Sequence, residues 1–181
     1  MRVILTNKLT WTIYFLLIIT LIVLYGMLFS FSPQEYYDIK LEDKLINNQW
    51  YTVFLHNFST ALIYILLGIA TFGVASLILI IVNVSAIALS ITTMYSITGS
   101  IKVSVFTIFT HGLIELFAIA VSFNLSFISI KWLTNKLFKN KIFQVENMAE
   151  FIKNILFMAV LYLFASLLES YLTPLILRES L

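Results

Sequence analysis

Cysteine is absent from the 181-residue sequence, so disulfides, thiolate nucleophiles and cysteine metal clusters are excluded. Only two histidines, His56 and His111, are available as imidazole ligands for a metal. The chain has no glycine-rich phosphate loop, so any use of ATP would belong to a separate subunit. The net charge is only +2 and no basic tract is present, so nucleic acid is not expected as a partner. We therefore expect no enzymatic activity, no cofactor and no metal site.

Charge is scarce as well, because Asp, Glu, Lys and Arg make up 11% of the residues while 61% are hydrophobic. A soluble domain is about a quarter charged and about half apolar. A soluble chain of this size could not hide so much apolar surface from water. The composition predicts a multi-pass membrane protein, with all 181 residues in one all-α transmembrane domain.

Long apolar runs divide the chain into membrane spans. A helix crosses the hydrocarbon core with about 20 residues. Residues 57–99 carry no charge, and about 43 residues in one helix would measure about 64 Å, twice the core thickness. This run must fold back, and the hinge is predicted at Thr71–Gly73. A bundle of five transmembrane helices is expected, at about residues 9–31, 57–72, 74–98, 102–130 and 154–177.

The segment 131–153 between the last two spans is net basic and is too polar to cross lipid. The positive-inside rule places it in the cytoplasm together with the N-terminus. Its middle, Lys139–Glu150, could form a short interfacial helix. We expect a cytoplasmic partner to contact four lysines of this segment: Lys131, Lys136, Lys139 and Lys141.

The fourth predicted span carries an acid and an imidazole at mid-membrane depth, Glu115 and His111, one helical turn apart. An ionised acid at the bilayer centre costs about 2.5–3.5 kcal/mol on insertion scales. Glu115 should therefore face protein or water, stay protonated, or hydrogen-bond to a partner such as His111. The pair belongs to a stripe of small and polar residues at steps of three and four: Ser104, Thr107, His111, Glu115, Ala118, Ser122, Ser126 and Ser129. Such stripes let membrane helices approach closely.

The second, third and fifth predicted spans carry similar rows of small and polar residues, so we expect the rows of all four spans to face one another. Asn83 and Glu169 belong to rows on the third and fifth spans, and Thr60, Tyr64 and Gly68 form a row on the second. Two readings stay open. These residues could line a polar cavity that moves protons, ions or a peptide, or they could hold the bundle together and contact a partner subunit.

Three short motifs resemble the stage II sporulation protein M family of small membrane proteins. Residues 110–118 read THGLIELFA, where the family has Pro-His-Gly, two apolar residues and then Glu-Leu-Pro-Ala. Residues 169–174 read ESYLTP, like the family's Glu, three residues, Thr-Pro ending. Asn83 matches a third position, although glycine does not follow it here. The resemblance marks His111, Gly112, Glu115, Glu169, Thr173, Pro174 and Asn83 as candidate intramembrane functional residues.

The resemblance implies two settings for such a protein. Some members are expected to act in the maturation, export or immunity of circular bacteriocins, beside an ATPase and other membrane proteins, and this short chain favours that setting. Others scaffold peptidoglycan-remodelling machinery in sporulation, and a proton-coupled carrier is a third hypothesis. The expected partners are the lipid bilayer, other membrane subunits, a separate ATPase and further copies of this chain.

Overall fold

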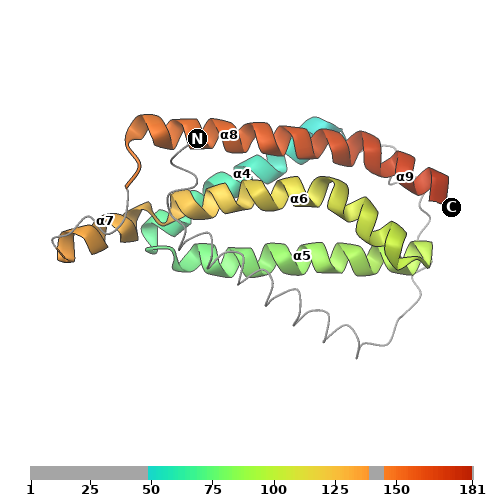
Figure 1. The fold of residues 1–181 in the computed structure, drawn as a ribbon, viewed down its shortest axis with the longest axis horizontal. Helices are drawn as coiled ribbons and strands as arrows, with labels where there is room; N and C mark the ends of the chain where they lie inside the picture. Colours follow the sequence, from blue (N-terminus) through green and yellow to red (C-terminus); the bar gives the residue numbers. More distant parts are fainter. Residues whose placement is uncertain (1–48, 139–144, 181) are drawn as a thin grey trace, which may run out of the picture.

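A computed structural model describes residues 49–138 and 145–180 of the chain. The first predicted span at 9–31, Lys139 and Lys141 lie outside these ranges. The described part is built from helices (Figure 1). In chain order they are α4 (Trp50–Ala70), α5 (Val74–Thr98), α6 (Ile101–Ser126), α7 (Ile128–Leu137), α8 (Met148–Leu167), the π-helical segment η1 (Leu168–Leu172) and α9 (Thr173–Ser180).

Four of these helical runs are long and apolar enough to cross a membrane: Trp50–Ala70, Val74–Ser96, Ile101–Leu137 and Met148–Ile176. The protein is therefore a multi-pass, all-helical membrane protein over the residues that the structure describes. The helices extend beyond the predicted apolar windows, since α4 begins at Trp50 and α8 begins at Met148. The reason is physical: an apolar window measures the hydrocarbon core, whereas a helix continues through the polar interface.

Helix α6 lies at the centre of the bundle and packs against α4, α5 and α8 (Figure 1). Every residue from 118 to 126 is buried, which means that this part of α6 is covered on all sides. The stripe predicted from the sequence lies at these contacts, because Ser104, Thr107, Ser122 and Ser126 are almost completely buried. Small side chains on α6 let three other helices approach it at the same level.

The charge-free run folds back at Thr71–Gly73, where the sequence places the hinge. Phe72 and Gly73 have positive φ angles of 53° and 91°, which reverse the chain within three residues. One turn earlier, Gly68 is buried where α4 meets α5 and α6, and a side chain there would collide with Ser76 and Ser126. Glycine at 68 therefore permits close packing, and glycine at 73 permits the turn.

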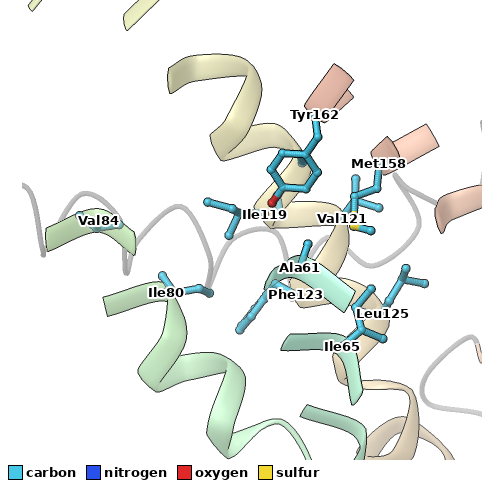
Figure 2. Close-up of a cluster of buried hydrophobic side chains, with 12 residues drawn as sticks. Ala61, Ile65, Ile80, Val84, Ile119, Val121, Phe123, Leu125, Met158 and Tyr162 are labelled. Carbon is cyan, nitrogen blue, oxygen red and sulfur yellow. The ribbon is translucent and has the colours of Figure 1, made fainter. Parts of the chain in front are cut away.

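The apolar core lies on the half of α6 that follows the polar motif. Figure 2 shows side chains from four helices meeting there, including Ile65 of α4, Ile80 of α5, Phe123 of α6 and Met158 of α8. The Ser122 hydroxyl donates to the Met158 sulfur at 2.8 Å within this layer. The core thus fixes the helices around this half of α6. The side chains of the polar motif lie along the other half of the helix.

The basic segment is more helical and less exposed than predicted. Residues 139–144, where half of the expected helix at Lys139–Glu150 would lie, are outside the described residues. Helix α7 (Ile128–Leu137) continues from α6 after Phe127, residues 145–147 are not helical, and residues 148–150 begin α8. Helix α8 begins with a capping box, in which the Asn147 side chain accepts from the Glu150 amide at 2.9 Å. The Asn-x-x-Glu spacing fixes this start well before the apolar run.

Candidate functional site: a polar cavity beside the central helix

A cavity of about 490 Å³ lies between α4, α5, α6 and η1. Its lining mixes polar and apolar side chains: Thr52, Val53, His56, Asn57, Asn83, Ala86, Ile87, Ser90, Ile108, His111, Gly112, Glu115, Ile119 and Glu169. Thr52, His56, Ala86 and Ser90 are exposed. The cavity is therefore open to the outside of the described bundle. Its volume lies within the range of about 300–1,000 Å³ that is typical of ligand sites.

Glu115 is held at the wall of this cavity by a residue of another helix. The Asn57 side-chain amide on α4 donates to Glu115 Oε1 at 2.7 Å. A hydrogen bond to a carboxylate is stronger than one between neutral groups, and it fixes the Glu115 rotamer against α4. A carboxylate has about four acceptor positions, so Glu115 keeps capacity for further donors.

His111 contacts the C-terminal helix. Its Nδ1 lies 3.3 Å from the Thr173 hydroxyl, and 62 residues separate the two in sequence. His111 is 8% exposed, and Thr173 is also 8% exposed. This contact joins the His-Gly motif of α6 to the Thr-Pro motif of α9 inside the bundle.

The π-helical segment η1 places Glu169 and Thr173 on the side of α6. Pro174 has no amide hydrogen, and in an α-helix its ring would collide with the carbonyl of residue 170. The wider turn relieves this conflict, since the Thr173 amide bonds to the Leu168 carbonyl five residues earlier. Glu169 lines the cavity as a result. Pro174 thus acts on the backbone and not as a ligand.

Asn83 reaches the same region from α5. Its side-chain amide donates to the Tyr64 hydroxyl at 2.9 Å, which joins α5 to α4. A second cavity of about 110 Å³ shares Asn57, Asn83 and Glu115 with the first and adds Tyr162 of α8. Polar groups of four helices therefore line one connected region deep in the bundle.

Gly112 is buried and lines the larger cavity, but the backbone does not require glycine there. An added methyl group would meet only Ile108, at 3.7 Å. Gly112 therefore differs from Gly68, where an added methyl group would collide with side chains of two neighbouring helices. The absence of a side chain at Gly112 keeps space in the cavity beside His111 and Glu115.

Lys131 does not lie on the surface, so its assignment to a cytoplasmic partner site is wrong. Its side chain is 3% exposed and forms an ion pair with Glu146 at 3.2 Å. Both groups also bond to the Asn124 side chain, at 2.9 Å and 3.1 Å. A buried cation requires such partners, and the ion pair joins Lys131 of α7 to Glu146, which lies just before α8. Lys136 is exposed, with its ammonium 4.9 Å from the Trp132 ring centre.

The structure thus brings together His111, Gly112, Glu115, Asn83, Glu169 and Thr173 and adds residues that the sequence did not single out. Asn57 is the most important, since it bonds to Glu115. It lies one turn before Thr60 in the polar row of α4, so extending that row would have found it. Among the described residues, no three His, Asp or Glu side chains gather as metal ligands would.

Fold and site together define a multi-pass helical membrane protein with a polar cavity beside its central helix. A family model, Stage II sporulation protein M, matches residues 10–174, which is most of the chain. The chain belongs to the stage II sporulation protein M family. Comparison with curated proteins and with solved structures gives no match.

Proposed function

We propose that this chain is a non-enzymatic subunit of a plasma-membrane complex that matures, exports or confers immunity to a hydrophobic peptide of the circular bacteriocin type. The larger cavity would hold part of that peptide, and a separate ATPase would supply energy. In this arrangement α6 is the rigid centre, and α4, α5 and η1 surround the bound segment.

The observation that carries the proposal is the cavity of about 490 Å³ at the family motifs. Two sequence motifs that lie about 60 residues apart meet at its wall through the His111–Thr173 contact. Packing alone does not require the open space, because Gly112 could accept a methyl group without a clash. A cavity with apolar and polar walls within a membrane bundle suits an apolar peptide that has polar backbone groups.

The test is co-purification of the tagged full-length protein from its native host in mild detergent. We expect an apolar peptide and at least one further membrane subunit to elute with the wild-type protein. Gly112→Leu would fill the cavity and should reduce peptide recovery about tenfold or more, whereas a change to leucine at the exposed Ala70, outside the lining, should not. Recovery of the protein alone from the native host would contradict the proposal.

A second candidate is a membrane scaffold for peptidoglycan remodelling in sporulation, which the family description favours. In that case cell-wall hydrolases would co-purify in place of a peptide. A strain that lacks the gene would then be impaired in spore formation and would keep its tolerance to the peptide. The third hypothesis, a proton-coupled carrier, requires proton flux in vesicles that contain this protein alone.

A further inference from the structure

Glu169 is an acidic side chain at the wall of the larger cavity. It forms no hydrogen bond or ion pair with any residue that the structure describes, although it is half-buried. Buried or half-buried carboxylates in membrane helices are rare without a partner, because lipid does not solvate them. The free acceptor faces the same space as Glu115.

His111 supplies a second unsatisfied group at this wall. Its Nδ1 is engaged by Thr173, while its Nε2 has no hydrogen-bond partner within the described ranges. The side chain is 92% buried, so this nitrogen can meet only what enters the cavity. Two separate side chains thus offer hydrogen-bonding capacity that the part of the chain described by the structure does not use.

The charged side chains of the lining determine whether a cationic or an anionic group would bind. Glu115 and Glu169 both line the larger cavity, and no lysine or arginine is present in its described lining. A cationic group is therefore attracted and an anionic group is repelled. A bare metal ion is a poor candidate, because the described residues contain no cluster of three or more ligands. The cavity of about 490 Å³ is also far larger than the ~30 Å³ that one water-sized occupant takes.

The apolar part of the lining indicates which kind of group would carry the cation. Val53, Ile87, Ile108 and Ile119 come from three helices and form hydrophobic wall between the polar groups. Lysine and arginine match this combination, since their long methylene stems bury against apolar surface while the charged head meets an acceptor. An apolar peptide segment with one such residue would pair its cation inside the membrane, where an unpaired charge is costly.

We propose that the larger cavity binds the lysine or arginine side chain of an apolar peptide segment, with its cationic head between Glu115 and Glu169 and its stem against the isoleucines. This inference rests on the proposed function, because it names the part of the peptide that the subunit recognises. The Asn57 bond to Glu115 Oε1 leaves the second oxygen of that carboxylate for the ligand.

The test uses the full-length protein in dodecyl maltoside, a detergent without an amine, and a leucine-rich helical peptide with a single central lysine. The matched probe has norleucine at that position. We expect the lysine peptide to bind at least about tenfold more tightly than the norleucine peptide. Glu169→Gln and Glu115→Gln should each remove most of this preference.

Glu150→Gln is the matched control, because Glu150 lies outside the cavity and glutamine can replace glutamate in the capping box. Should the cavity variants fail to fold, wild-type protein with a photoreactive group next to the peptide lysine serves instead. Cross-links at lining residues such as Val53, Ile87 or Ile119 support the site, and cross-links confined to residues outside the lining overturn it.

Equal binding of the two peptides to the wild-type protein would overturn this inference, and so would full preference in the double Glu115→Gln, Glu169→Gln variant. Loss of the preference on adding phosphatidylethanolamine would assign the site to a lipid amine and also overturn the inference.

The inference and the proposed function can fail independently. If the Glu115→Gln and Glu169→Gln variants co-purify with the native complex as well as the wild-type protein does, only the lysine site is contradicted. If the lysine peptide binds with the expected preference but no native complex is recovered, only the proposed function is contradicted.

Discussion

The hydroxyl of Thr173 lies 3.3 Å from Nδ1 of His111, so the start of the last helix, α9, is anchored to the middle of the central helix α6. Both side chains are buried, and the π-helical turn before Pro174 positions Thr173 for this contact. The bond gives the Thr-Pro motif a structural role next to the cavity.

Thr173→Val should weaken this anchor. Valine keeps the shape and removes the hydroxyl, so the free energy of unfolding should fall by about 1 kcal/mol. Thermal unfolding of the purified protein in detergent measures the effect. Thr93→Val is the control, because Thr93 is exposed on α5 and should change stability by less than about 0.5 kcal/mol. Equal stability of the two variants would show that the contact contributes nothing.

Two glycines should respond differently to the same change. Gly68→Ala forces a methyl group against Ser76 and Ser126, so we expect a loss of about 1–3 kcal/mol in stability. Gly112→Ala meets only Ile108 at 3.7 Å and should be neutral or slightly stabilising, since alanine favours the helix. Thermal unfolding of both variants tests this, and the reverse order would contradict the packing described.

The buried ion pair gives a third prediction. Lys131→Met leaves Glu146 and Asn124 without their cation, so the free energy of unfolding should fall by about 3 kcal/mol. The double variant Lys131→Met, Glu146→Met should recover part of this loss, because no unpaired charge remains. Lys136→Met is the control, since Lys136 is exposed. A similar loss in Lys131→Met and Lys136→Met would contradict the buried pair.

Orientation can be tested directly, because the chain has no cysteine of its own. Lys102 lies in the first turn of α6 and Lys136 lies at the far end of α7, so single cysteines at these positions should lie on opposite sides of the membrane. The positive-inside rule predicts that Lys102→Cys reacts with an impermeant thiol reagent in intact cells and that Lys136→Cys does not. The opposite pattern would reverse the topology.

The apolar runs and the hinge at Thr71–Gly73 could be predicted from the sequence, because hydrocarbon thickness constrains them directly. The stripe on α6 was also visible, since its small residues recur with helical spacing. The partner of Glu115 was not, because Asn57 lies 58 residues away and only the packing of α4 against α6 brings it near. The prediction for Lys131 failed for a similar reason: its charge suggested a surface position, and its buried partner Glu146 lies 15 residues further along the chain.

The account depends most on the larger cavity being open to water and not filled by lipid or by protein. Ser90→Cys places a thiol on its exposed edge, and Leu113→Cys places one on an exposed part of α6 outside the lining. In reconstituted protein, a positively charged, membrane-impermeant thiol reagent should modify the cysteine at position 90 at least about tenfold faster than the one at 113. Equal and negligible modification of both, with full reaction after denaturation, would contradict an open cavity and the functions proposed for it.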